Sequence, residues 1–575
     1  MPRRLLTLLA AILFFLAPGM PCAFGQDNPP AQYKVLEELN VSVAMRDGIR
    51  LSTNIYRPDT SGQFPALLIR SPYGNGGSGN REGHFFAGRG YAVVIQDTRG
   101  RAESEGVFDA FQPEALDGLD TQEWVASQPW CTGKIGTLGG SYVGFTQWLP
   151  AALGSPHLVT MFPVVTFADQ HDMAYYGGAA RLRLFTAWSL EMTHPYSVTR
   201  EELEARMDSV FRHLPLIEQD RAAGWRVSFL RDWLSHPEHD SYWDRSSIGE
   251  GYEKIKASTY NVGGWFDICL SGTLINFMSM TSSAVDPEVR AKQKLLIGPW
   301  VHSLSRDGKV GELDFGPESV PSLQQTELRW FDNQLKGVDN GIMAEAPVKI
   351  FVMGANVWRE EQEWPLARTK YTSYYLHSGG KANTGSGDGT LSTVLPNAEA
   401  SDNFSYDPAD PVPSTPDAPT DQRKLETRPD VLVFTSAVLK KPLEVTGPVE
   451  ATLYASSSAP NTDFTAKLID VYPDGRAIRL CDGIIRASFR EGSTGTSNIE
   501  PGKVYQYKID LWATSNLFLQ DHRIRVEVSS SNFPRFDRNL NTGGTFAFDS
   551  TLAVAKQTIY HSREYPSYIK LPVIE

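Results

Sequence analysis

The run Gly139-Gly-Ser-Tyr-Val-Gly144 constrains this chain more than any other part of its sequence. Small apolar residues lead into it from Lys134, and an apolar, helix-like pattern follows it. A serine at such a strand-to-helix turn has an exposed hydroxyl and a helix N-terminus beneath it. Glycine is needed because larger side chains would collide with the neighbouring elements. The pattern is typical of a hydrolase nucleophile, although a plain glycine-rich turn can carry the same residues.

Two later segments supply the acid and the base that such a serine needs. Asp267 ends the run Tyr260-Asn-Val-Gly-Gly-Trp-Phe-Asp267, and His302 follows Lys294-Leu-Leu-Ile-Gly-Pro-Trp300. Both runs are typical of buried strands that break at glycine or proline. The order Ser141, Asp267, His302 is that of an α/β-hydrolase. Singly, the aspartate is better explained as a helix cap and the histidine as a loop residue; together they favour catalysis.

These segments resemble the bacterial cocaine-esterase-like hydrolases, which are related to the Xaa-Pro dipeptidyl peptidases. The resemblance runs from about Val35 to the C-terminus and is looser around residues 170–255. It implies that Ser141, Asp267 and His302 form a catalytic triad. It also implies that the Tyr73 hydroxyl and the backbone N–H of Tyr142 bind the oxyanion. Further matching motifs are Arg70-Ser-Pro-Tyr73, Asp97-Thr-Arg-Gly100, Glu123-Trp-Val-Ala-Ser-Gln-Pro-Trp130, Phe351-Val-Met-Gly354 and Asp470-Val-Tyr-Pro-Asp-Gly475.

The predicted elements divide the 575 residues into several parts. Buried strand-like runs alternate with a helical pattern early in the chain, which indicates a parallel sheet. Thr199-Arg-Glu-Glu202 is a capping box within a helical insertion, expected to cap the active site. Short strands beyond Thr369 predict a β-sandwich, the place where the family carries its jelly roll. The expected divisions are a signal peptide (1–25), an α/β-hydrolase domain (35–168 and 258–369), a helical cap (169–257) and a jelly-roll domain (370–575) with a long loop near 379–427.

The N-terminus predicts export. Arg3 and Arg4 precede an apolar run too short for a permanent membrane anchor, and Ala23-Phe-Gly25 fits cleavage before Gln26. Cys22 leaves lipidation open. The net charge of −13 argues against nucleic acid and anionic membranes as partners. We therefore expect a periplasmic or extracellular protein without a stable membrane anchor.

The substrate is expected to be a small ester, amide or short peptide. Residues 268–270 after Asp267 are uncharged, whereas related α-amino-acid ester hydrolases place two acids there. The predicted pocket is therefore aromatic and largely neutral, formed by Asp172, Tyr175, Tyr176, Phe266 and Trp300.

This pocket favours a serine hydrolase that acts on an apolar acyl group, with no cofactor and no metal. Three alternatives remain open. The first is an Xaa-Pro dipeptidyl-peptidase-type exopeptidase or acylase. The second is an inactive secreted binding protein, and the third is a metalloenzyme using Asp463, Asp470 and Asp474.

Overall fold

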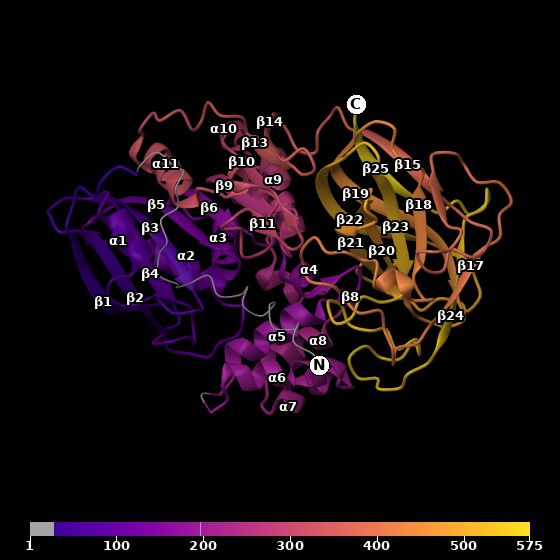
Figure 1. The fold of residues 1–575 in the computed structure, drawn as a ribbon. Helices are drawn as coiled ribbons and strands as arrows, with labels where there is room; N and C mark the ends of the chain where they lie inside the picture. The colour runs from indigo at the N-terminus through magenta and orange to yellow at the C-terminus, as the bar shows by residue number, and fades with distance from the viewer. Residues whose placement is uncertain (1–27, 196) are drawn as a thin grey trace.

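The structure, a computed structural model, describes residues 28–195 and 197–575. The expected signal peptide, with Cys22 and the cleavage before Gln26, lies outside the described residues. Figure 1 shows an α/β domain, a helical insertion below it and a C-terminal β domain beside both. Within the described ranges, none of the helices has the length and apolar character needed to cross a membrane.

A ten-stranded sheet forms the α/β domain, in the order β1-β2-β4-β3-β5-β6-β9-β10-β13-β14. Neighbours from β4 to β13 pair in parallel, and β1 and β2 form an antiparallel hairpin around Arg46-Asp-Gly48. The inner strands are buried on both faces, which explains their continuous apolar runs.

The strands of this domain are β1 Val35–Ala44, β2 Arg50–Pro58, β3 Phe64–Ser71, β4 Ala92–Asp97, β5 Cys131–Gly140, β6 Leu158–Val164, β9 Ser258–Gly264, β10 Lys294–Gly298, β11 Lys309–Val310, β12 Leu313–Asp314, β13 Val348–Val352 and β14 Val357–Glu361. Its helices are α1 Arg81–Ala87, α2 Glu114–Ala126, α3 Tyr142–Ala152, α9 Leu270–Ser283, α10 Pro287–Ala291 and α11 Leu323–Lys336.

The helical insertion lies between β6 and β9 in the sequence. The capping box at Thr199 and Glu202 is formed, with both reciprocal hydrogen bonds, and it starts α6. The insertion packs around buried aromatic rings such as Trp188 and Trp233. Its elements are α4 Gln170–Ala174, β7 Tyr175–Tyr176, β8 Ala179–Ala180, α5 Leu182–Thr193, α6 Arg200–Arg212, α7 Gln219–Ala223 and α8 Ser228–Ser235.

The C-terminal domain is mostly β-sheet. One prediction here was wrong, because the expected long loop near 379–427 contains β16 and β17, which pair with neighbouring strands. In β17 burial alternates, and Phe404 and Tyr406 face inward, a strand pattern hidden among turn residues. The strands are β15 Lys370–His377, β16 Thr390–Ser392, β17 Asp402–Tyr406, β18 Leu432–Ser436, β19 Leu443–Ser457, β20 Asp463–Val471, β21 Ala477–Arg486, β22 Tyr505–Phe518, β23 Arg523–Ser529, β24 Ala555–Tyr560 and β25 Tyr568–Ile574.

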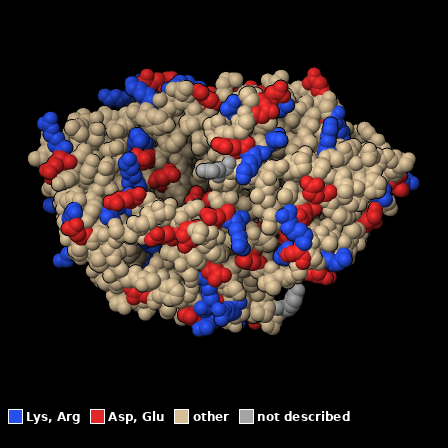
Figure 2. Space-filling view, turned by 180° about the vertical axis from the view of Figure 1, so that it is seen from behind, with Lys and Arg blue, Asp and Glu red and all other residues tan. Residues whose placement is uncertain are grey.

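Acidic and basic side chains are intermixed on the face shown in Figure 2. No patch of one sign dominates that face. Among the described residues the cysteines Cys131, Cys269 and Cys481 are free and buried.

Candidate active site

Ser141 lies in the sharp turn between β5 and α3. Its backbone has φ 58° and ψ −122°, a conformation that L-residues rarely adopt. The tight turn depends on its glycines, because a Cβ on Gly139 would lie 2.2 Å from Val143 Cγ1. A Cβ on Gly144 would lie 2.6 Å from Thr166 Cβ, and Thr166 Oγ1 donates to the Ser141 carbonyl at 2.8 Å. The serine is therefore held in a strained, defined position at the start of a helix.

Asp267 and His302 form a chain of hydrogen bonds with Ser141. His302 Nε2 lies 2.9 Å from Ser141 Oγ, and His302 Nδ1 lies 2.7 Å from Asp267 Oδ1. The three residues follow β5, β9 and β10, whose carboxyl ends share one edge of the parallel sheet. Asp267 is fully buried and His302 is 8% exposed. This geometry lets the imidazole accept the serine proton while its other N–H donates to the carboxylate.

Tyr73 and Tyr142 pack against this turn. Their rings meet edge to face with centroids 6.5 Å apart, and Trp188 Nε1 donates to the Tyr73 hydroxyl at 3.2 Å. Because Trp188 supplies the hydrogen of that bond, the Tyr73 hydroxyl keeps its own proton to donate. Burial raises the pKa of Tyr73 to about 12, so the phenol stays protonated at neutral pH. Tyr142 opens α3, so its N–H has no partner four residues earlier within the helix.

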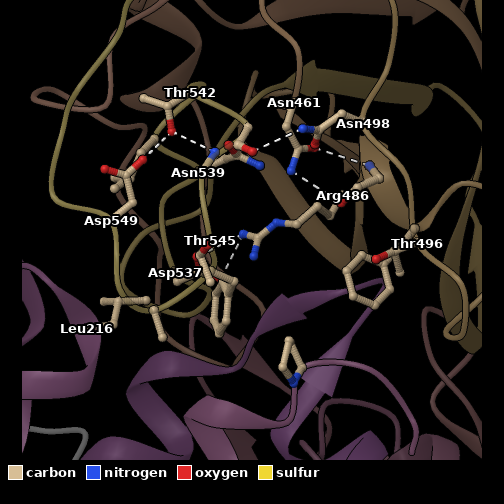
Figure 3. A pocket seen from close by; sticks show the side chains of 18 of the residues that line it. Leu216, Asn461, Arg486, Thr496, Asn498, Asp537, Asn539, Thr542, Thr545 and Asp549 are labelled. Carbon is tan, nitrogen blue, oxygen red and sulfur yellow. Dashed lines mark hydrogen bonds and ion pairs between the residues drawn. The ribbon is translucent and has the colours of Figure 1, made fainter.

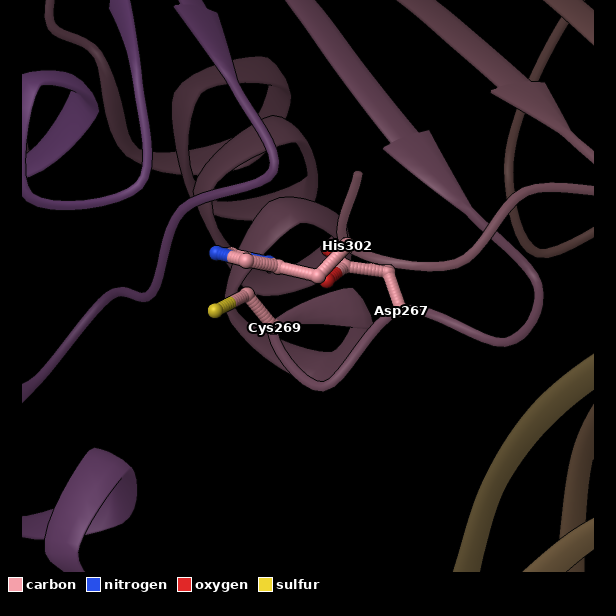
Figure 4. Close-up of side chains that lie close together, drawn as sticks. All are labelled: Asp267, Cys269 and His302. Carbon is pink, nitrogen blue, oxygen red and sulfur yellow. The ribbon is translucent and has the colours of Figure 1, made fainter. Parts of the chain in front are cut away.

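Cys269 lies beside Asp267 and His302, and ligand atoms of the three residues lie within 4.8 Å of one another (Figure 4). That spacing alone is compatible with a cation. Asp267 and His302 are, however, already hydrogen-bonded to each other. Burial also raises the pKa of the Cys269 thiol well above its usual value, and a neutral thiol is a poor metal ligand. We therefore interpret the cluster as part of the hydrogen-bonded site.

Two of the aromatic residues expected in the pocket lie in the core instead. Trp300 is fully buried, and its indole N–H donates to the Ser319 carbonyl at 2.7 Å. Tyr175 is 1% exposed, and its hydroxyl donates to the Trp233 carbonyl at 2.8 Å. The prediction that these two side chains contact substrate was wrong. Tertiary packing covers their rings, and their polar groups are hydrogen-bonded to backbone carbonyls.

The other three expected pocket residues differ in exposure. Phe266 is 8% exposed and packs toward Phe315. Tyr176 packs edge-on against Trp512 of the β domain, with centroids 5.4 Å apart. Asp172, on α4, has a side chain that is 55% exposed. Of the five, Asp172 alone presents a largely open polar group.

Histidines and acids of the C-terminal domain have partners within that domain. His377 and His561 pair with Glu399 and Asp402, respectively. The acids of the possible metal cluster each face a basic group: Asp463 pairs with Arg486, Asp470 with His522 and Asp474 with Arg476.

A separate cavity of about 340 Å³ lies where the helical insertion meets the β domain (Figure 3). Arg486 reaches into its wall and donates to Asp463 and Asp537. Residues from both parts line the cavity, including Leu216, Phe489 and Asp537. Of the described residues that line this cavity, none is Ser141, Asp267 or His302. The cavity is therefore distinct from the candidate active site.

The fold and the motifs define an α/β-hydrolase with a C-terminal β domain, and comparisons with known proteins identify its family. Residues 47–304 match the model of the X-Pro dipeptidyl-peptidase (S15) family, and residues 340–570 match that of the X-Pro dipeptidyl-peptidase C-terminal non-catalytic domain. Cocaine esterase of Rhodococcus sp. (strain MB1 Bresler) is 39% identical over 571 residues, which cover 93% of this chain and 98% of that protein. A putative Xaa-Pro dipeptidyl-peptidase of Bacillus anthracis is 23% identical, over 87% of this chain and 84% of that one.

Solved structures agree with this assignment. An α-amino acid ester hydrolase superimposes with a TM-score of 0.80 and 26% identity, covering 97% of this chain and 100% of the other. An aminopeptidase from a marine sediment Thaumarchaeota archaeon gives a TM-score of 0.82, also with 26% identity, covering 97% and 99% of the two chains. The chain belongs to the cocaine-esterase-like serine hydrolases, related to the Xaa-Pro dipeptidyl peptidases.

Proposed function

We propose that this chain is a secreted serine hydrolase that cleaves carboxylic esters or amides through an acyl-enzyme on Ser141. The observation that carries the proposal is the hydrogen-bonded chain from Ser141 Oγ through His302 to Asp267, at 2.9 and 2.7 Å. His302 takes the serine proton during attack, and Asp267 orients the imidazole and stabilises its charged form. Water then releases the acyl group, with His302 again as the base.

Two donors are proposed for the oxyanion that forms during attack. One is the backbone N–H of Tyr142, the residue after the nucleophile. The other is the Tyr73 hydroxyl, which accepts from Trp188 and therefore has its own hydrogen free. Because both groups are fixed before substrate arrives, they need little reorganisation as charge develops.

The proposed substrates are esters or amides with a neutral, apolar acyl group. Ile268, Cys269 and Leu270 follow Asp267, so this segment offers no carboxylate to pair with a substrate ammonium. The 39% identity with cocaine esterase also favours an ester. An Xaa-Pro dipeptidyl-peptidase activity is the second candidate, because the exposed carboxylate of Asp172 could bind a free N-terminus.

A substrate panel separates these two candidates. We expect nitrophenyl benzoate or butyrate to be hydrolysed with a larger enhancement over its uncatalysed rate than Ala-Pro or Gly-Pro nitroanilide. Each dipeptide is compared with its N-acetylated form, and Asp172→Asn is the matched variant. If acetylation or Asp172→Asn abolishes an otherwise efficient anilide reaction, the exopeptidase assignment replaces the esterase one and the nucleophile is unaffected.

Export is proposed from residues 1–25, which have the charged start, apolar run and small-residue end of a signal peptide. N-terminal sequencing of the mature protein from the periplasm or medium is expected to begin at Gln26. A protein retained in the cytoplasm with Met1 intact would contradict this location.

A further inference from the structure

Arg181 is a buried cation beside the Asp267 turn. It is 5% exposed, and within residues 28–195 and 197–575 it forms no ion pair with a carboxylate. Burial lowers the pKa of its guanidinium from the usual value. Burying a guanidinium without a paired carboxylate costs free energy of folding.

The guanidinium joins three separate segments through its hydrogen bonds and its face. One Nη donates to the carbonyl of Ile268, directly after Asp267, and the other donates to the carbonyl of Asp172 at 3.2 Å. Its central carbon lies 5.6 Å from the ring centroid of Trp512, in the β domain. Arg181 therefore ties the turn that carries Asp267 to both the helical insertion and the β domain.

Asp267 has few other partners that could hold it. Its Oδ1 accepts from His302, and its Oδ2 is buried with no hydrogen-bond partner in the described part of the chain. Asp267 is also one of the acidic groups whose charge acts on Arg181. Arg181 is thus a cation near this carboxylate that also binds the carbonyl of the residue after it.

The β domain fixes the backbone that leads into Arg181. Asp537 Oδ1 accepts the N–H of Ala180 at 2.7 Å, and the Asp537 N–H donates to the Ala180 carbonyl at 2.9 Å. The backbone N–H of Arg486 donates to the Gly177 carbonyl at 2.7 Å, and the Arg486 side chain holds Asp537 at 2.8 Å. These bonds clamp strand β8 to the wall of the cavity in Figure 3.

We propose that Arg181 is a positioning residue for Asp267 and that the β domain contributes to catalysis by holding Arg181 in place. The inference rests on the triad proposed above. The proposal assigns a role in catalysis to the β domain, which matches a family model described as a non-catalytic domain.

The effect can be separated from ordinary packing through the pH profile. The charged and titratable groups around Arg181 are Asp172 on α4, Tyr176 on β7, Asp267 and Cys269 in the β9–α9 turn, and Asp417 and Arg535 of the β domain. Around His302 they are Asp267 and Cys269. The acid limb of the kcat profile reports protonation of the proposed triad. Removing a nearby positive charge favours the protonated form, so this limb moves to higher pH.

The decisive variants are Arg181→Gln and Arg181→Lys. For Arg181→Gln we expect kcat to fall about 10- to 100-fold with little change in KM, and the acid limb to rise by about half to one pH unit. Arg181→Lys keeps the charge but cannot reach both carbonyls. We expect it to lose less activity and to keep the wild-type acid limb. Arg183→Gln is the matched control, because it removes the Arg183–Asp417 ion pair at the same boundary without touching the Asp267 turn.

Titrating active sites with a fluorophosphonate gives kcat per competent molecule, so partial misfolding does not obscure the result. Wild-type kcat and acid limb in Arg181→Gln would overturn the proposal, and so would equal losses in Arg183→Gln. If Arg181→Gln does not fold, an acid limb shifted in Arg181→Lys contradicts the role of the charge. Activity retained by Ser141→Ala would instead disprove the proposed function, which is a distinguishable failure.

Discussion

Arg486 and Asp267 are both buried charges, yet their surroundings differ. Arg486 donates to Asp463 and to Asp537 through bonds of 2.8–2.9 Å, so two carboxylates surround one guanidinium. Asp267 has one short bond, to His302, and its second oxygen is without a partner among the described groups. The first cluster lies at a boundary between parts of the fold, and the second at the candidate active site.

The difference follows from what each cluster has to do. A fully hydrogen-bonded network is rigid and keeps its charges fixed, which suits a boundary. In the proposed mechanism a proton moves between Ser141 and His302 during turnover, so that site needs one defined path and few competing partners. Substitutions at Arg486 should therefore affect stability most, with a smaller effect on turnover through Arg181, whereas substitutions at the triad should affect turnover.

The largest effect is expected at the triad. Ser141→Ala and His302→Ala should each lower kcat by roughly 10⁶-fold, and Asp267→Asn by about 10⁴-fold. The free energy of unfolding should change by less than about 1 kcal/mol for Ser141→Ala, because little buried volume is lost. Turnover and urea unfolding of the same preparations measure both quantities. A His302→Ala enzyme with a tenth of wild-type turnover means that the base has been misassigned.

Arg486→Met is expected to lower stability first, and turnover only to a smaller extent through Arg181. It leaves two buried carboxylates without their cation, which should lower the free energy of unfolding by about 3–5 kcal/mol. Adding Asp537→Asn should recover part of this loss, because one of the unpaired charges is removed. Urea midpoints of the single and double variants measure the effect. A midpoint unchanged by Arg486→Met would remove the contrast between the two clusters.

Tyr73→Phe tests the second proposed oxyanion donor. It removes one hydroxyl and leaves the ring packed against Tyr142, so folding should be preserved. We expect kcat to fall about 10²- to 10³-fold with KM much less affected, because the hydroxyl acts chiefly in the transition state. Steady-state kinetics on a nitrophenyl ester measure the split. An unchanged kcat with a raised KM would place Tyr73 in substrate binding alone.

The smallest effect concerns a partly buried pair in the helical insertion. His239 lies 3.2 Å from Asp169, and this hydrogen bond raises the pKa of His239 from 6.5 to about 9. The raised pKa stabilises the folded state fully below about pH 6.5, and the stabilisation is lost as pH rises through about 9. His239→Gln should cost about 0.5–1 kcal/mol at pH 6 and nothing at pH 10. Thermal unfolding at the two pH values checks this, and equal losses at both would exclude a charge effect.

The fold class and the three hydrogen-bonded residues could be predicted from the sequence, because the patterns that indicate them are local. Ser141, Asp267 and His302 each follow a strand that breaks at glycine or proline, and parallel strands place their carboxyl ends at one edge. Such a signal needs only a few neighbouring residues, and the family motifs reinforced it.

The surroundings of the site depend on contacts that no local pattern records. Trp300 and Tyr175 stand next to motif residues, but long-range packing buries them. Trp188 resembles any apolar residue of a helix, and nothing near Arg181 in the sequence shows that its side chain reaches Ile268. Strand β17 was missed because turn residues on either side concealed its alternation.

Covalent labelling tests the central claim most directly. The protein is treated with a fluorophosphonate probe, digested, and the modified peptide is mapped by mass spectrometry. The proposed mechanism predicts a single adduct per chain, on Ser141, that is absent in Ser141→Ala and forms much more slowly in His302→Ala. No adduct on the wild-type protein, or an adduct on another residue that survives Ser141→Ala, would contradict the assignment of Ser141 as the nucleophile.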